Sequence, residues 1–530
     1  MLTFLVIVPV LIAAFLYVWS TNDIARVAAI IFQLALFAAA AYLVFLTRHQ
    51  DVFTSIGNFE GFLGITLHAS HLSADFVFIT TLIFLAVSIY SYRENRDMPL
   101  FWFLLFLMEA SLIGLFLSGD LFNIFVLVEV STIVTLMLVM YNRKMRHTFH
   151  AMLFLMANVI TAQFYLFGLG YVYMVAGTLD IQAITIALAL LDRETQVLPY
   201  ALIITAVMFK ASLIPFFSWT PKVKIYSGAP SVVQAILSGL QVKSALYLFI
   251  RFQDVFVTID AREFFMAIGI ISGIFGAFMA ICQSNIKLIL AYHTISQVGL
   301  IVLGLSISNM HSNIGGLYHI FSHAIFKTTL FLGSGIIVHS YGTANVYAIR
   351  GVFRRMPLVA IATGAAVLGI TGAPFFIGSV SKYFIAYDIP IWLNAVIILI
   401  GLGTITSFTK FSTIFFGQSQ LVGDMVRPET CKTVTTLALG SLCLLGGAFG
   451  TQAIYFLFRE DVSVVLSSYV QKSVIYFASV LAAVAAYKYF ISGNTTLKKI
   501  GSLGFGFKTI IAAIGVFFAI VLAYAGFVAA

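Results

Sequence analysis

Residues 119–129 read GDLFNIFVLVE, and they place an acidic side chain, Glu129, inside a long apolar run. A helix that starts at about Asp120 and ends near Tyr141 would carry Glu129 about 13 Å from its start, at a rise of about 1.5 Å per residue. A charge at mid-membrane costs at least about 2.5 kcal/mol on insertion scales, so it persists where it is paired, neutralised or functional. A structural hydrogen bond between helices is the alternative interpretation of Glu129.

The rest of the chain has the composition of a polytopic membrane protein. Of its 530 residues, 61% are hydrophobic and only 9% are charged, whereas soluble domains carry about 25% charged residues. A spanning helix needs about 20 apolar residues, and the apolar runs between short polar breaks predict about fourteen such helices. Soluble folds are therefore excluded. The net charge of +9 indicates orientation signals in loops rather than nucleic-acid binding.

The basic residues alternate between the short loops. One basic loop lies at residues 93–96 and another lies two helices later at residues 143–146, while the break at 118–120 between them carries no basic residue. Basic loops favour the cytoplasm, so we predict a multi-pass protein of the cell (inner) membrane with its N-terminus outside. The first apolar run begins at Leu2 with no basic residue before it, which predicts an uncleaved first helix.

A Pro-Phe-Phe triplet occurs twice, at residues 215–217 and 374–376, each time near a lysine, Lys210 or Lys382. The apolar segment before the first triplet is bounded by Pro199. It spans about 22 Å against a hydrocarbon core of about 30 Å, so it predicts a helix that stops inside the membrane. Freed backbone groups are tolerated there only if they face protein or a water-filled cavity. Paired interruptions of this kind indicate a transporter built from repeats, with its ion path at the breaks.

Further ionisable side chains fall inside predicted helices. Lys243 lies about 20 Å into its helix. His319, His323 and Lys327 follow one another at intervals of four residues, which places them on one helix face. Two histidines four residues apart suit zinc, but no third ligand is near and Lys327 would repel a dication. We therefore expect no metal, and a file of protonatable side chains instead.

These groups predict an order of proton transfer. Burial favours the neutral form of a lysine and a carboxylate neighbour favours its charged form, so Glu129 and Lys210 are predicted to form a pair that exchanges a proton. Lys243 would receive the proton next, and Lys382 would end the series. Asp120 and Glu109 are candidate accessory residues.

Two of the other polar side chains in or beside apolar runs are more ambiguous. Glu109 could be a second carboxylate of the first half or a lateral contact to another subunit. His293, near a predicted helix start, is expected at the membrane interface, and so are the tryptophans near helix ends, Trp102 among them.

Five blocks, in this order, resemble the antiporter-like subunits of Mrp multisubunit cation/proton antiporters, respiratory complex I and membrane-bound hydrogenases. The blocks are GDLFNIFVLVE (119–129), FKASLIPFFSW (209–219) with APSVVQAILSGLQVK (229–243), LAYHTISQVG (290–299), HIFSHAIFK (319–327) and GAPFFIGSVSK (372–382). The resemblance covers approximately residues 100–385, and the first block is most similar to the D-type subunits of the Mrp antiporters. The sequence departs from the common pattern at Phe217, where a histidine is usual, and at Asn285, where an aspartate is common.

The resemblance implies an all-α polytopic fold with two inverted repeats, each with a Pro-broken helix. It implies the proton-translocating subunit of a multisubunit Na+/H+ antiporter, with no cofactor and no catalytic chemistry of its own. Its partners would be other membrane subunits, H+ and Na+, and the lipid bilayer. The proton path would comprise Glu129, Lys210, Lys243, His319, His323, Lys327 and Lys382.

The sequence is compatible with one alternative function and disfavours another. The same module could serve a membrane-bound hydrogenase or a complex I-like redox pump. A stand-alone channel is disfavoured, because a channel does not need Glu and Lys in series.

The repeats predict four parts of the chain. Residues 1–98 would hold N-terminal helices and an extracytoplasmic hairpin, 99–251 the first antiporter-like repeat, 252–416 the second, and 417–530 the C-terminal helices. A polar piece at 178–196 is expected to lie along the membrane surface.

Overall fold

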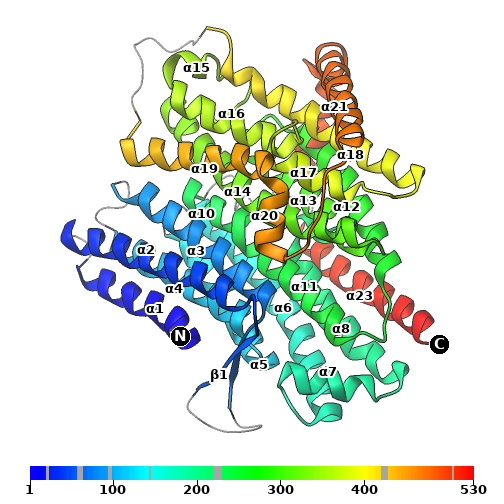
Figure 1. Cartoon of the computed structure of the whole chain (residues 1–530). Coiled ribbons are helices and arrows are strands. Elements are labelled where there is room, and N and C mark those ends of the chain that lie inside the picture. The colour runs from blue at the N-terminus through cyan, green and yellow to red at the C-terminus, as the bar shows by residue number, and fades with distance from the viewer. Residues whose placement is uncertain are drawn as a thin grey trace. The chain divides into compact units, whose positions relative to one another are not determined.

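The computed structural model describes residues 1–19, 23–56, 64–93, 98–141, 145–218, 229–418, 428–503 and 506–530. Within these residues the chain is almost entirely helical, with a single two-stranded antiparallel hairpin (Figure 1). Fourteen of the described helices are long and apolar enough to cross a membrane. The predicted all-α polytopic fold is therefore confirmed.

The chain forms two compact units, and the first comprises Met1–Trp219, Leu240–Ala261 and Gly506–Ala530. Its elements are α1 (Leu2–Trp19), α2 (Asp23–Leu46), β1 (Val52–Ser55), β2 (Thr66–Ala69), α3 (His71–Ser91), α4 (Pro99–Leu117), α5 (Leu121–Met140), α6 (Met145–Ala176), α7 (Ile181–Ala189), α8 (Arg193–Ala211), η3 (Phe216–Ser218), α11 (Val242–Val255) and α23 (Phe507–Ala529). The last helix, α23, packs against α8 and η3.

The second unit comprises Thr220–Gly239 and Arg262–Phe505. Its elements are α10 (Ser231–Ile236), α12 (Arg262–Cys282), α13 (Ile286–Ser306), α14 (Met310–Tyr341), α15 (Val352–Arg355), α16 (Pro357–Thr371), α17 (Ile377–Ile385), α18 (Ile391–Ser412), η5 (Thr413–Phe415), α19 (Thr430–Ala448), α20 (Gly450–Phe458), α21 (Leu466–Ala486), η6 (Tyr487–Ile491) and α22 (Thr495–Ser502). A π-helical turn, η4 (Leu237–Gln241), lies where the chain passes from α10 to α11. The four-part division of the sequence stays a prediction.

The same short backbone pairing occurs once in each unit. Asp120 forms an isolated antiparallel bridge with Asp180 in the first unit, and Asn285 forms one with Asn345 in the second. Asp120 also caps α5, and Asn285 caps α13, because each side chain accepts a hydrogen bond from a backbone N–H of the first turn. The shared motif supports an internal repeat, independently of the Pro-Phe-Phe triplets.

A helix ends just before each Pro-Phe-Phe triplet. The first, α8, stops at Ala211, and Ser212 takes a left-handed conformation. The second, α16, stops at Thr371, and after the left-handed residues Gly372 and Phe375 the chain resumes as α17. Neither α8 nor α16 is among the fourteen spans: α16 has only 15 residues, whereas α8 has 19 and begins with two charged residues.

The beginning of α8 differs from the prediction. The helix starts at Arg193, so Pro199 lies inside it and does not bound it. Pro199 is buried, and its carbonyl oxygen would lie 3.2 Å from a Cβ added to Gly168 of α6. The helix therefore packs closely against α6 at the position of the proline.

The predicted surface piece at 178–196 contains the nine-residue helix α7. The hairpin predicted near residues 65–69 is the β1–β2 pair.

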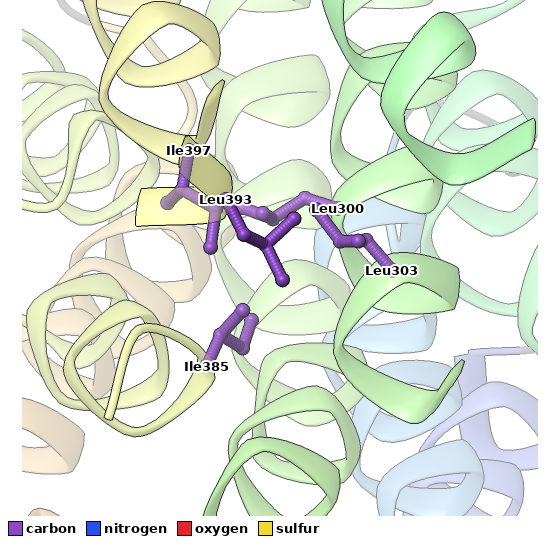
Figure 2. Close-up of a cluster of buried hydrophobic side chains, with 5 residues drawn as sticks. All are labelled: Leu300, Leu303, Ile385, Leu393 and Ile397. Atoms are coloured by element: carbon purple, nitrogen blue, oxygen red, sulfur yellow. The ribbon is translucent and has the colours of Figure 1, made fainter. Parts of the chain in front are cut away.

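An apolar cluster fixes the end of α17 in the second unit. Ile385 packs with Leu300 and Leu303 of α13 and with Leu393 and Ile397 of α18 (Figure 2). All five side chains are buried. At the other end of α17, Gly378 approaches α16 so closely that an added Cβ would collide with the Gly369 carbonyl oxygen. The second broken helix is thus held at both ends.

We expect Gly378→Ala to destabilise the protein by about 1–3 kcal/mol, the usual cost of overpacking. Gly364→Ala, in α16, is the matched control, because a Cβ there meets nothing within 4 Å. Thermal unfolding of the detergent-purified protein measures the difference. Equal melting temperatures for the two variants would contradict the close contact at Gly378.

Candidate functional site

A Glu–Lys ion pair lies at the break of the first repeat. Lys210, in the last turn of α8, donates a hydrogen bond to Glu129 Oε1 of α5 at 3.3 Å and another to Thr132 Oγ1 at 2.6 Å. The two charged side chains are only 24% (Glu129) and 15% (Lys210) exposed. The structure thus brings together the two groups that the sequence predicts as partners, and it adds Thr132, which sequence reasoning missed.

Two small cavities flank Lys210. One, of about 20 Å³, is lined by Glu129, Lys210 and Tyr165 among others. The other, also of about 20 Å³, is lined by Lys210, Gln241 and Ser244 among others. A cavity of at least about 10–15 Å³ with polar partners can hold one water molecule. Lys210 therefore lines two cavities, each with room for about one water molecule.

The second of these cavities is lined by two sequence neighbours of Lys243. Gln241 and Ser244 both line it, and Lys243 lies between them in sequence, at the start of α11 with an exposed fraction of 1%. Gln241 Oε1 accepts a hydrogen bond from Thr135 of α5 at 2.9 Å. The structure thus places the Glu129–Lys210 pair beside this cavity, and the transfer to Lys243 stays a prediction.

In the second unit, His319 is hydrogen-bonded on both sides. Its Nε2 lies 3.1 Å from Gln297 Oε1 of α13, and its Nδ1 lies 2.8 Å from Ser381 Oγ of α17. A carbonyl oxygen only accepts, so Nε2 carries a proton. The Ser381 hydroxyl can donate to Nδ1, or turn to the Gly378 carbonyl 3.2 Å away when Nδ1 takes up a proton. His319 can therefore exist in both charge states with its partners satisfied.

Both path lysines of this unit bind backbone carbonyls. Lys327 of α14 donates to Leu290 O of α13 at 2.5 Å, and Lys382 of α17 donates to Ile370 O, at the end of α16, at 2.7 Å. His319, His323 and Lys327 are each 0% exposed. Ser381, which precedes Lys382 in sequence, connects this side of α17 to His319.

The accessory acids occupy different environments. Glu109 of α4 is fully buried and accepts a hydrogen bond from Gln33 Nε2 of α2 at 2.5 Å. Asp120 lies just before the α5 span as its N-cap. Burial raises the pKa of the Asp120 carboxyl above its ordinary value, and the charge of Asp180 adds to the rise, while backbone N–H groups of Asn123 and Phe122 oppose it.

Some predictions about polar and aromatic side chains were wrong. His293, expected at the membrane interface, is 0% exposed; its Nε2 is hydrogen-bonded to Ser407 Oγ and its ring stacks on Phe408, both of α18. Trp102, also expected at the interface, is buried.

The sequence did not indicate Lys410 as a candidate site residue. Its ammonium donates to three carbonyls at the end of α12, those of Ala280, Ile281 and Gln283, at 3.2, 2.6 and 2.5 Å. Its place at the end of an apolar run gave no signal, because its acceptors lie about 130 residues away in sequence.

The part of the chain that the structure describes contains no cluster of three or more His, Cys, Asp or Glu side chains able to hold a metal ion.

Comparison with known proteins finds a family match over more than half of the chain. Residues 118–410 match the family model described as NADH:quinone oxidoreductase/Mrp antiporter, TM. The chain is 27% identical over 461 residues to the D-type subunit of the Na(+)/H(+) antiporter of Alkalihalophilus pseudofirmus, covering 82% of this chain and 92% of that one. It is 31% identical over 336 residues to the N-type subunit of the NADH-quinone oxidoreductase of Desulforudis audaxviator, covering 61% and 66%.

Two solved structures share the fold. A chain of the membrane-bound sulfane sulfur reductase, an archaeal respiratory membrane complex, superposes with a TM-score of 0.78 at 22% identity. A chain of the Mrp complex from a Dietzia species superposes with a TM-score of 0.76 at 23% identity. Each match covers 91% of this chain and 99% of the other. The predicted antiporter-like fold is therefore confirmed.

Two substitutions at Asp120 separate its capping role from its charge. Because its pKa is raised, ionisation of Asp120 costs stability that grows as pH rises through the folded-state pKa. Asp120→Asn keeps the cap without the charge, so we expect a melting temperature at neutral pH equal to or above the wild type, with the gap closing in acid. Asp120→Ala loses the cap and should cost about 1 kcal/mol at every pH. Thermal unfolding across a pH series tests both, and a less stable Asn variant at neutral pH would contradict this account.

Proposed function

Because the chain belongs to the NADH:quinone oxidoreductase/Mrp antiporter family, we propose that it is the proton-translocating subunit of a multisubunit Na+/H+ antiporter of the Mrp type. The observation that carries the proposal is the Glu129–Lys210 ion pair at a helix break, with a one-water cavity on each side of Lys210. The similarity to the D-type subunit of an Na(+)/H(+) antiporter, over most of both chains, supports the antiporter assignment.

The ion pair provides a means of releasing a proton. While Glu129 is ionised, it stabilises the Lys210 ammonium at 3.3 Å. A proton that arrives at Glu129 neutralises the carboxylate and leaves Lys210 as a buried cation without a counter-charge, which is costly in a low-dielectric interior. Lys210 then gives its proton to water in the cavity shared with Gln241 and Ser244, from which Lys243 takes it. Thr132 holds the lysine side chain in place throughout.

The proposed path in the second unit uses histidine and lysine. His323 and Lys327 continue the file on α14, and His319 takes up and releases a proton at Nδ1, the ring nitrogen beside Ser381 Oγ. Ser381 reorients between Nδ1 and the Gly378 carbonyl as the charge of His319 changes. Lys382, adjacent to Ser381, is the terminal group. Glu109, bound to Gln33 within this chain, and Asp120, a helix cap, remain accessory candidates.

The proposal includes a location and partners. We place the protein in the cell membrane with its N-terminus outside, on the distribution of basic loops. It would act with other membrane subunits, because its relatives and structural neighbours belong to multisubunit complexes. The similarity to an NADH-quinone oxidoreductase subunit keeps a redox-driven pump as the second candidate. Subunits that co-purify in mild detergent distinguish the two.

Replacing either member of the ion pair should abolish exchange. We expect Glu129→Gln and Lys210→Met to lower cation/proton exchange about 100-fold, on the scale of losing a proton-transfer group. Lys210→Arg should fail as well, because it keeps the charge but cannot release its proton. Exchange is measured by dye-reported proton movement in vesicles that contain the assembled complex.

Glu194→Gln is the matched control, since Glu194 is exposed in the first turn of α8 and should leave exchange unchanged. Wild-type exchange by a correctly assembled Glu129→Gln complex would contradict the proposed path.

Replacing His319 should lower the exchange rate in the same assay. We expect His319→Gln to reduce exchange at least about tenfold, because glutamine offers no protonatable nitrogen. His339→Gln, at the exposed end of the same helix, is the control and should retain the wild-type rate. If both variants exchange equally well, the path does not use this face of α14.

A further inference from the structure

One face of α21 forms hydrogen bonds to the end of α16, to the break after it and to the end of α17. Tyr476 Oη is hydrogen-bonded to Thr371 Oγ1, at the end of α16, at 3.0 Å. Tyr469 Oη accepts from the Phe375 N–H in the break at 3.0 Å. Lys472 donates to the carbonyls of Tyr383 and Ala386, at the end of α17, at 3.0 and 2.7 Å. These three residues of α21 recur at intervals of three and four, so they share one helix face.

The first broken helix has apolar support instead. Phe216, in η3 just after the break, packs its ring against Phe517 of α23 at a centroid distance of 4.8 Å and against Phe209 of α8 at 5.6 Å. The polar face of α21 is therefore a feature of the second repeat, and it brings a basic group with it.

Lys472 and Lys382 line the same cavity. Its volume is about 130 Å³, and its polar lining includes Thr371, Ser379, Asn394, Tyr469 and Tyr476. Lys382 reaches across the break to one carbonyl near the end of α16, that of Ile370, and Lys472 reaches from α21 to two carbonyls at the end of α17. Each lysine therefore caps the end of one half of the broken helix.

Among the described residues, no aspartate or glutamate lines this cavity, and the helices α13, α14 and α16 through α21 contain none in their sequences. The nearest acidic residue in sequence is Asp388, which follows α17 and is exposed. The titratable groups on the elements packed against α17 or α21, and on these two helices themselves, are His311, Tyr318, His319, His323, Lys327, His339 and Tyr341 on α14, Lys410 on α18, Cys431, Lys432 and Cys443 on α19, Tyr455 on α20, Tyr487, Lys488 and Tyr489 on η6, Lys382 and Tyr383 on α17, and Tyr469, Lys472 and Tyr476 on α21. Two ammonium groups in this cavity would repel each other without a carboxylate to offset the cost.

We propose that Lys472 is a positioning residue that controls the charge of Lys382: its ammonium, fixed on the end of α17, lowers the proton affinity of Lys382 and makes that lysine release its proton into the shared cavity. Lys472 has two carbonyl acceptors and Lys382 has one, so Lys472 keeps its charge while Lys382 gives it up. The inference rests on the proposed function only in that Lys382 ends the proton path.

Amine labelling measures the charge of each lysine directly, without transport. Reductive methylation of the intact complex over a pH series modifies only neutral amines, and peptide mass spectrometry gives a labelling midpoint for Lys382. We expect Lys472→Gln to move this midpoint about one pH unit to the alkaline side, the scale of one neighbouring charge. Lys472→Arg keeps the positive charge and should restore the wild-type midpoint, and Lys488→Gln, exposed on η6, should not change it.

The coupling must also act in reverse, because an interaction between two sites is reciprocal. Lys382→Gln should move the labelling midpoint of Lys472 to the alkaline side by the same amount, and this variant keeps the α17 cap in place. An unchanged Lys382 midpoint in Lys472→Gln, or an unchanged Lys472 midpoint in Lys382→Gln, would overturn the proposal and leave Lys472 as a helix cap only.

The pH profile of exchange connects the coupling to transport. With Lys472→Gln the profile should shift to the alkaline side, whereas a loss of structure alone would lower exchange at all pH values equally and overturn the regulatory role. These results are independent of the Glu129 experiment. Exchange that survives in the Glu129 variant refutes the proposed function and leaves the labelling result standing.

Discussion

The backbone carbonyls at the end of an interrupted helix must find hydrogen-bond donors, because the bilayer core offers no water to satisfy them. In this protein, lysine side chains supply many of these bonds. Lys382 binds the end of α16 and Lys472 the end of α17. Lys410 binds the end of α12 in the same way, although α12 is not interrupted. A lysine in this position compensates the negative end of the helix dipole as well as the open carbonyl. The same bond also fixes the position of an ionisable group, so under the proposed function Lys382 would serve both as a helix cap and as a proton carrier.

The two repeats share a backbone bridge, but the partners of their charged side chains differ. The bridge that precedes α5 joins two aspartates, and the one that precedes α13 joins two asparagines. Glu129 offsets Lys210 in the first repeat, whereas the path lysines of the second bind neutral carbonyls. The proposed proton transfer would therefore use an ion pair in the first repeat. In the second repeat it would depend on interactions among basic groups.

The sequence predicted the features that depend on the free-energy cost of placing a charged side chain within one apolar helix. A glutamate in an apolar run requires a partner, and Lys210 near a break was the natural one, so the pair was predictable. The start of α8 was not, because packing against α6 at Gly168 keeps the helix intact across Pro199. His293 and Lys410 were misjudged or missed for another reason. Their partners on other helices are more than 110 residues away along the chain, and no local pattern records such a contact. Lys472 went unnoticed because it resembles an ordinary basic residue near a helix end.

The small volume around Lys210 has a consequence for selectivity. Each flanking cavity is about 20 Å³, room for about one water molecule. A sodium ion would have to shed nearly all of its hydration shell to enter, and it would meet an ammonium group there instead of a ring of oxygen ligands. A proton has neither difficulty, because it passes along a single bridging water by exchange of bonds. In the proposed path, these two cavities would therefore favour protons over hydrated sodium ions, both by their size and by the charge of Lys210.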